Sequence, residues 1–269
     1  LRKRNYPEKI LLGSLAGSGT LGLLIPPSII LIIYGVAVQE SIAKLFIAGI
    51  IPGIMIALIF MSYVIIWSLI NKKEMPKILE EYSFLEKIKR SKQLLPVILL
   101  ISAVIGSIYT GIATATEAAS LGVVGALILS YFQKSLTLET FKSSLLGATK
   151  TSCMIAFILA GSTFLSLAMG FTGLPRNLAI WIQGMELSPY VLILVLMIFY
   201  IILGMFLDGI SAVVLTMAII EPMIRQAGFD MIWFGIFLVI VVEMAQITPP
   251  VGFNLFVLQG MANKDMGYI

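Results

Sequence analysis

The sequence is poor in charged and metal-binding side chains. It has no histidine, one cysteine and 12% charged residues, whereas 59% of its 269 residues are hydrophobic. Without histidine there is no imidazole triad and no imidazole metal site. A single cysteine, Cys153, excludes an internal disulfide and a CxxC pair. The GxxxxGK[ST] pattern is also missing, so this chain has no P-loop with which to hydrolyse ATP.

The hydrophobic content predicts an all-α polytopic membrane protein. Soluble domains have about 25% charged residues, and one of this size has no means of hiding so much apolar surface from water. The composition therefore excludes a soluble enzyme, a disordered chain and a nucleic-acid-binding protein. The expected surroundings are instead a lipid bilayer.

Apolar runs of about 20 residues mark the predicted membrane segments. Residues 1–70 contain a broken helix at 10–38, interrupted at Ile25-Pro26-Pro27-Ser28, and a span at 42–70. The charged stretch 71–93 predicts an amphipathic linker on the membrane surface. Residues 94–269 begin with three predicted spans at 94–110, 117–132 and 151–171, and a polar link at 133–150 joins the last two. A surface segment at 175–187 and a hairpin at 190–224 follow. The last element is a broken helix at 231–261, interrupted at Thr248-Pro249-Pro250.

The segment 190–224 consists of two apolar halves that meet near Asp208 and Gly209. Each half is short for a complete crossing of the bilayer. The sequence therefore predicts a re-entrant hairpin, in which two half-helices meet inside the membrane.

The distribution of basic residues predicts which links face the cytoplasm. Links 1–9, 71–93 and 133–150 hold four, seven and three Lys or Arg residues, respectively. The links on the opposite side hold one each, namely Lys44, Arg176 and Arg225. Since cytoplasmic links are enriched in basic residues, the first three are assigned to the cytoplasm. This assignment requires the hairpin to enter and leave on the same side.

An inverted internal repeat is predicted from the two broken helices. A shift of 223 residues places Pro26-Pro27 on Pro249-Pro250, and the same shift aligns the basic and aromatic residues in front of them. The first copy starts on the cytoplasmic side and the second on the opposite side. Copies of opposite orientation are typical of secondary transporters.

The two Pro-Pro breaks are the predicted centre of the chemistry. Each proline removes a backbone donor, and carbonyls without partners at membrane depth require protein, water or an ion. Na⁺ suits such oxygens, and the free N-termini of the half-helices suit a carboxylate. A single break is more typical of a simple proline kink; two breaks in an inverted repeat favour a site. Hydroxyls near the breaks come from Thr20, Ser28 and Thr248, and glycines that would allow close backbone approach are Gly19, Gly22 and Gly252.

Four acidic residues lie near or inside apolar segments, where a charge is costly. Asp208 either caps the second half of the hairpin or contacts an ion or substrate. Glu117, after Thr114 and Thr116, has the same two interpretations, with helix capping preferred. Glu243 either lines the cavity near Thr248 or makes a structural polar contact. Glu221 is expected to be solvated.

Four motifs together resemble the large membrane subunit of tripartite ATP-independent periplasmic (TRAP) transporters. They are GSGTLGLLIPPSIILIIYG at 17–35, TATEAASLG at 114–122, GMFLDGISAV at 204–213 and ITPPVGFNLFV at 247–257. The resemblance covers nearly the whole chain in the right order. It implies a multi-pass protein of the bacterial inner membrane that works as an elevator. The implied partners are a small membrane subunit and a periplasmic solute-binding protein, and the implied activity is Na⁺-coupled import of carboxylates such as C4-dicarboxylates or sialic acids.

The resemblance also implies a set of binding residues and no cofactor besides the coupling Na⁺. Family Na⁺ sites between hairpin tips and helix breaks correspond here to Asp208, Gly209, Ser211, Thr248, Pro249 and Gly252 in one half and to Gly19, Thr20, Gly22, Pro27 and Ser28 in the other. The substrate is expected beside Ser28, Thr248 and Asn254, supported by Pro26, Pro250, Thr114, Thr116, Glu117 and Glu243.

The family pattern also places a first hairpin before residue 1 and a last span after residue 269, so the chain is expected to be a fragment. Two other functions remain open at this point. One is an ion-coupled carrier of the same architecture that needs no binding protein. The other is an intramembrane aspartyl protease, which requires two facing aspartates, whereas only Asp208 lies deep in an apolar run. Proton coupling through Glu243 or Asp208 also remains open.

Overall fold

The described part of the chain is helical and has no strand. The computed structural model describes residues 6–76, 86, 91–173, 177, 180–181, 184, 188–250, 252–262 and 264–269. Within these residues, five helices are long and apolar enough to cross a membrane, or six if one bent pair is a single span. This confirms the prediction of an all-α polytopic membrane protein. The chain divides into two compact units, Leu1–Pro76 with Ile158–Ile269, and Lys77–Phe157.

The first broken helix consists of α1 (Glu8–Leu24) and α2 (Ile29–Ala37), which meet at an angle of 41°. The break at residues 25–28 is where the sequence predicts it, because Pro26 and Pro27 have no N–H to bond the carbonyls four residues earlier. The Pro26-Pro27 peptide bond is cis.

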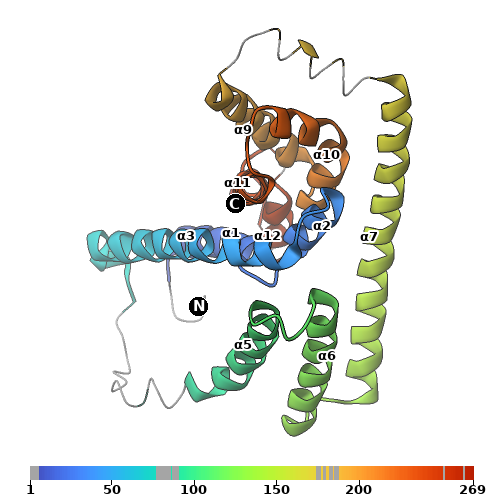
Figure 1. Cartoon of the computed structure of the whole chain (residues 1–269). Helices are drawn as coiled ribbons and strands as arrows, with labels where there is room; N and C mark the ends of the chain where they lie inside the picture. The colour runs from blue at the N-terminus through green and yellow to red at the C-terminus, as the bar shows by residue number, and fades with distance from the viewer. Residues whose placement is uncertain are drawn as a thin grey trace. The chain divides into compact units, whose positions relative to one another are not determined.

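Helix α3 (Ile42–Ile70) follows α2 and packs along the first broken helix (Figure 1). It continues through Pro52 and is capped by Asn71, the residue after its last turn. The side-chain amide of Asn71 donates to the Trp67 carbonyl over 3.0 Å. Gly49 allows the close packing, since a Cβ there would lie 3.1 Å from the Leu24 carbonyl oxygen. A short 3₁₀ helix, η2 (Lys72–Glu74), comes next. The predicted amphipathic helix at 71–93 lies mostly outside the described residues.

The predicted hairpin is formed by α9 (Pro189–Phe206) and α10 (Gly209–Gln226). Both arms have 18 residues, and each is long and apolar enough to cross a membrane by itself. The expectation that the arms are too short to cross is therefore wrong, because 18 residues of this hydropathy are enough for a membrane span. The surface segment predicted at 175–187 lies largely outside the described residues.

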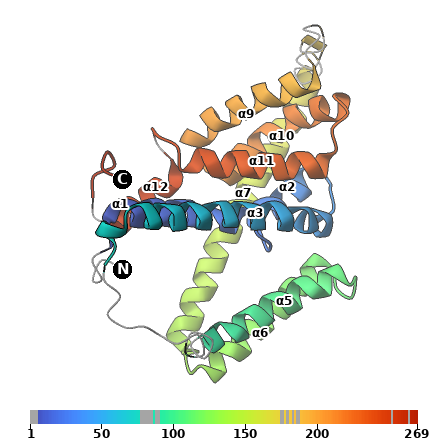
Figure 2. The same cartoon turned by 90° about the vertical axis from the view of Figure 1, so that its left-hand side faces the viewer.

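The second broken helix consists of α11 (Met231–Gln246) and α12 (Phe253–Ala262), separated by residues 247–252. The amide of Gly252, in this break, donates to the carbonyl of Met205, near the end of α9, over 3.0 Å. The turn of the hairpin therefore stops beside the break, and α12 continues past it (Figure 2). The structure therefore places the hairpin turn beside the second break.

The two broken helices run in opposite directions. The Tyr34 hydroxyl of α2 donates to the carbonyl of Met231, the first residue of α11, over 2.6 Å. At the other end, Lys264, which follows α12, forms an ion pair of 3.3 Å with Glu8, the first residue of α1. Each second half-helix thus meets the start of the other broken helix, as an inverted repeat requires (Figure 2).

The other unit contains η3 (Lys92–Leu94), α5 (Leu95–Tyr109) and α6 (Ala115–Phe132), close to two predicted spans. Helix α7 (Leu138–Thr172) is much longer than the predicted span 151–171. The polar link predicted at 133–150 is therefore helical from residue 138 onwards. Thr137 and Thr140 exchange backbone–side-chain hydrogen bonds of 2.8 and 3.1 Å at the helix start, and such caps favour helix formation.

Candidate functional site

The turn between α9 and α10 places Asp208 and Gly209 at the start of a helix. One carboxylate oxygen of Asp208 accepts the amides of Ile210 and Ser211 over 3.1 and 3.2 Å. The other accepts the Ser211 hydroxyl over 2.5 Å. Asp208 is therefore the N-cap of α10, where its negative charge also complements the helix dipole. Capping was one of the two roles predicted for it.

Gly209 brings the hairpin turn into contact with both broken helices. A Cβ at this position would lie 2.6 Å from Ile30 Cδ1 of α2, 2.7 Å from Gln246 Nε2 and 2.9 Å from Val242 Cγ1 of α11. Only glycine fits so close to three side chains. The predicted meeting of the hairpin with the two breaks is thus present at this residue.

The second break is closed by the predicted residues Thr248 and Gly252. The Thr248 hydroxyl donates to the Met244 carbonyl over 2.6 Å, and its amide donates to the Ala245 carbonyl over 3.0 Å. Gly252 has a φ of +54°. A Cβ there would lie 3.0 Å from the Gln246 carbonyl oxygen, which confirms the predicted close backbone approach. Pro249 and Pro250 are exposed and joined by a cis peptide bond.

The first break is closed mainly by Ser28. Its hydroxyl donates to the Leu23 carbonyl, which lost its helical partner to Pro27, and it accepts the Leu31 amide over 3.2 Å. Ser28 is fully buried. Thr20 is also buried, and its hydroxyl donates to the Gly17 carbonyl of its own helix over 2.8 Å. The hydroxyls of Ser28 and Thr20 thus both donate to backbone carbonyls of α1.

Gly19 and Gly22 do not make the close backbone contacts predicted for them. Both are exposed, and a Cβ at either would have no neighbour within 4 Å. They lie on the face of α1 that points away from the packed helices. Of the prolines in this break, Pro26 is buried and Pro27 is exposed.

Two buried polar residues lie on α11 close to the breaks. Glu243 and Gln246 are each 4% exposed. The Glu243 carboxyl interacts with the backbone of Leu24, the last residue of α1. This is a structural polar contact, one of the two roles predicted for Glu243. Sequence reasoning missed Gln246, although a lone amide in an apolar run two residues before Thr248 is the same kind of signal as Glu243.

Asn254 lies in the first turn of α12, immediately after the second break. Its side-chain Nδ2 is buried and has no hydrogen-bond partner. A free amide donor beside a helix N-terminus suits an anionic oxygen.

The predicted supporting residues Thr114, Thr116 and Glu117 belong to the other unit, at the start of α6. Thr114 and Glu117 form a capping box: the Thr114 amide donates to Glu117 Oε2 over 2.8 Å, and the Glu117 amide donates to Thr114 Oγ1 over 3.3 Å. Thr116 is exposed. The preferred interpretation of Glu117, a helix start, is confirmed.

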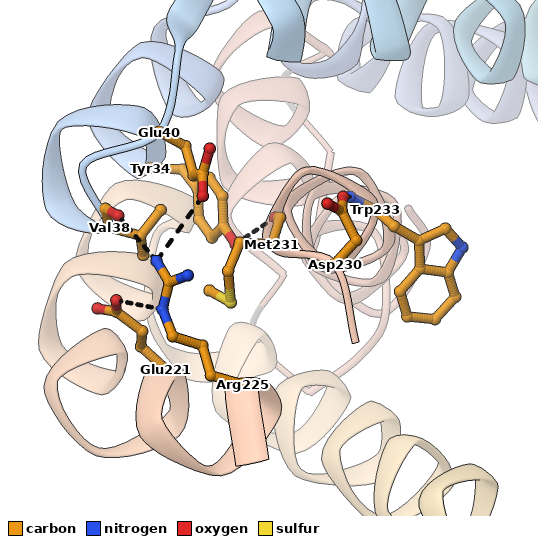
Figure 3. A network of polar contacts seen from close by, with 8 residues as sticks. All are labelled: Tyr34, Val38, Glu40, Glu221, Arg225, Asp230, Met231 and Trp233. Carbon is orange, nitrogen blue, oxygen red and sulfur yellow. Dashed lines mark hydrogen bonds and ion pairs between the residues drawn. The ribbon is translucent and has the colours of Figure 1, made fainter. Parts of the chain in front are cut away.

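A polar network at the end of α10 links the two repeats (Figure 3). Arg225 donates to Glu221 over 2.9 Å and to the Val38 carbonyl over 3.3 Å, and it lies 3.7 Å from Glu40. Sequence reasoning used Arg225 only as a topology marker and expected Glu221 to be solvated. Its pairing with Glu221 at i, i+4 is readable from the sequence, whereas the contact with α2 is not.

The aspartates needed for an intramembrane protease are not brought together. Asp230 caps α11, where it accepts the Trp233 amide over 2.9 Å (Figure 3). This is the end of α11 opposite to the residues that contact the hairpin turn. Asp208 therefore has no facing aspartate from that helix.

Comparison with known proteins identifies the family. Residues 1–269 match the family of the DctM component of tripartite ATP-independent periplasmic transporters. Three relatives cover 97% to 100% of this chain. The C4-dicarboxylate TRAP transporter large permease protein DctM of Pseudomonas aeruginosa is 33% identical, and the chain covers 62% of it. The 2,3-diketo-L-gulonate TRAP transporter large permease protein YiaN of Escherichia coli is 31% identical, with 61% covered.

The third relative is the sialic acid TRAP transporter permease protein SiaT of Haemophilus influenzae, 31% identical, of which the chain covers 43%. The chain thus spans less than two thirds of the length of these relatives, which are named as transporter permeases and not as enzymes. Because the family match extends over all 269 residues and contains both helix breaks and the hairpin, the chain belongs to the DctM component family of tripartite ATP-independent periplasmic transporters.

Proposed function

We propose that this chain forms part of the permease subunit of a Na⁺-coupled importer of organic acids in the bacterial inner membrane. A small membrane subunit and a periplasmic solute-binding protein would complete the importer. The observation that carries the proposal is the contact of the hairpin turn with both broken helices at Gly209. Three interrupted backbones meet there, and such places hold ions and substrates in transporters.

The Na⁺ would bind where the backbone of the second break and the hairpin turn lie together. Prolines 249 and 250 deprive the carbonyls of Ala245 and Gln246 of their helical donors. The Gly252 amide ties this break to the end of α9. A desolvated cation prefers carbonyl, hydroxyl and carboxylate oxygens, and Thr248 and Asp208 supply the last two types.

The carboxylate substrate would bind at the N-terminal ends of the half-helices. The start of α12 offers Asn254 Nδ2, a buried donor without a partner. The starts of α2 and α10 already carry their own caps, Ser28 and Asp208. Anions are favoured at helix N-termini by the backbone amides and the dipole, so α12 is the proposed anion side of the site.

Transport would proceed by an elevator movement of the hairpin and broken helices as one body. The contacts that join these elements support this mechanism. Tyr34 is bonded to Met231, Gly252 to Met205 and Lys264 to Glu8, so α1, α2, α9, α11 and α12 are connected at both ends and in the middle. A rigid body of this kind can carry a bound solute without opening its own helices.

The class of substrate is proposed from the relatives. Their names include C4-dicarboxylate, 2,3-diketo-L-gulonate and sialic acid, each of which is a carboxylate. A carrier that works without a binding protein is disfavoured, because these relatives are named as TRAP permeases.

Solute uptake by the full-length permease, assembled with its partners in proteoliposomes, tests the proposal. We expect Na⁺-dependent uptake that falls at least about tenfold on Thr248→Ala or Asn254→Ala, since a factor of ten corresponds to about 1.4 kcal/mol of lost interaction. Asp230→Asn is the matched control, because Asp230 caps α11 away from the site and asparagine is an equally good cap. Uptake that is independent of Na⁺, or equal in all variants, would contradict the proposal.

A further inference from the structure

Glu243 is a buried acid whose charge is not balanced by any protein group in the described residues. The side chain is 4% exposed, and its Oε1 has no hydrogen-bond partner. A carboxylate removed from water without a partner is strongly disfavoured, and the penalty is greater at membrane depth. Glu243 lies four residues before the second break begins.

The end of α1 beside Glu243 also offers backbone oxygens that can help to hold a cation. The Glu243 carboxyl interacts with the backbone of Leu24, the last residue of α1. A helix C-terminus carries a partial negative charge. The carbonyl of Gly22 also lacks its helical donor, because Pro26 has no N–H. A positive charge at this place would be attracted by the carboxyl and by the end of α1.

No basic side chain of the packed helices reaches Glu243. The neighbours of α11 are α1, α2, α3, α9, α10 and α12. Three of these, α2, α9 and α12, contain no charged residue. The charged and phenolic groups of the neighbours are Glu8, Lys9, Tyr34, Lys44, Tyr63, Tyr190, Tyr200, Asp208, Glu221 and Arg225. The ion pairs among the described residues involve Arg225 and Lys264 only, at the helix ends.

We infer that the Glu243 carboxyl is a binding site for a monovalent cation, a proton or Na⁺, held between α11 and the end of α1. Either cation neutralises the buried acid. The site joins the two broken helices, so its occupancy is linked to their packing. This inference deepens the proposed function, on which the role of the cation as a coupling ion rests.

Infrared difference spectroscopy of the purified full-length permease tests the inference without a transport assay. In Na⁺-free buffer at neutral pH we expect a protonated-carboxyl band that Glu243→Gln lacks and Asp230→Asn keeps. Persistence of the band on addition of Na⁺ assigns the site to a proton, and its disappearance assigns the site to Na⁺ in competition with a proton. An ionised Glu243 band that is present without Na⁺ and unchanged by it would overturn the inference.

Two further observations keep this test separate from the proposed function. The Na⁺-induced difference spectrum of the wild-type protein requires no substitution, so the test survives if Glu243→Gln fails to fold. Uptake is measured on the same preparations. A Glu243 band with the expected response but no Na⁺-dependent uptake would refute the proposed function alone. Na⁺-dependent uptake with an ionised, unresponsive Glu243 would refute this inference alone.

Discussion

The two helix breaks share a Pro-Pro pair but are stabilised in different ways. The first is closed by its own residue, since Ser28 bonds both the Leu23 carbonyl and the Leu31 amide. The second depends on another element, since the Gly252 amide donates to Met205 of the hairpin. The same Pro-Pro pair is therefore compatible with two different ways of closing the break. The second break is therefore the one whose backbone is tied directly to the hairpin.

The glycines around the two breaks differ in how much space the neighbouring atoms leave for a side chain. Gly19 and Gly22, before the first break, have open space where a Cβ would point. Gly209, in the hairpin turn, and Gly252, in the second break, would each bring a Cβ within 3.0 Å of neighbouring atoms. The contrast predicts that a side chain added at Gly209 or Gly252 is much more harmful than one added at Gly19 or Gly22. Four variants with matched controls test this, in order of decreasing expected effect.

Gly209→Val is expected to have the largest effect. Its Cβ would overlap with Ile30, Gln246 and Val242, and overpacking of a tight interior costs about 1 to 3 kcal/mol or more. We expect loss of uptake and a lower unfolding temperature in the full-length permease. Gly13→Val, in α1, is the matched control, because a Cβ there has no neighbour within 4 Å. Equal effects of the two variants would contradict the packing described for the hairpin turn.

Ser28→Ala is expected to come next, because it leaves a buried carbonyl and a buried amide without partners. The loss of such a pair costs about 1 to 3 kcal/mol, measured as a lower denaturation midpoint. The control is Ser188→Ala, which removes an exposed cap that accepts the Val191 amide over 3.4 Å. If Ser188→Ala destabilises the protein as much as Ser28→Ala, the first break is not closed in the way described.

Gly252→Ala should have a moderate effect from two sources. The φ of +54° is unfavourable for alanine by about 1 to 2 kcal/mol, as for other left-handed residues. The Cβ would also approach the Gln246 carbonyl. Gly228→Ala is a close control, since Gly228 has a φ of +82° but open space around a Cβ. The difference in unfolding free energy between the two variants isolates the contact at the break, and a difference of zero would show that no such contact exists.

Arg225→Met is expected to have the smallest effect on stability. The Arg225 side chain is 49% exposed, and exposed ion pairs contribute about 0.2 to 1 kcal/mol. Lys264→Met is the comparison at the other end of the broken helices. Both losses should shrink in high salt because the pairs are screened. A loss of several kcal/mol at Arg225, unaffected by salt, would mean that the network joins the repeats more strongly than its exposure suggests.

The sequence predicts those features of the fold that depend on local chemistry. Adjacent prolines interrupt helices wherever they occur, so both breaks are placed correctly, whereas the single Pro52 lies inside a continuous helix. The role of Asp208 as a cap is equally local. The length of α7 was missed because hydropathy detects the apolar span but not the more polar helical turns before it.

The contacts of the site were less predictable because they join residues far apart in the chain. The pairing of Tyr34 with Met231 spans 197 positions, and no motif indicates it. Glycines in a motif look alike, yet Gly209 is enclosed and Gly19 is open. The orientation of Glu243 towards Leu24 also follows from helix packing and not from its distance in sequence to Thr248.

Binding of radioactive Na⁺ to the purified full-length permease tests the central claim most directly. If the second break and the hairpin turn form the Na⁺ site, saturable binding in the wild-type protein is weakened at least about tenfold by Thr248→Ala, or about 1.4 kcal/mol. Asp230→Asn should bind as the wild type does. Unchanged Na⁺ affinity in a folded Thr248→Ala variant would contradict the account.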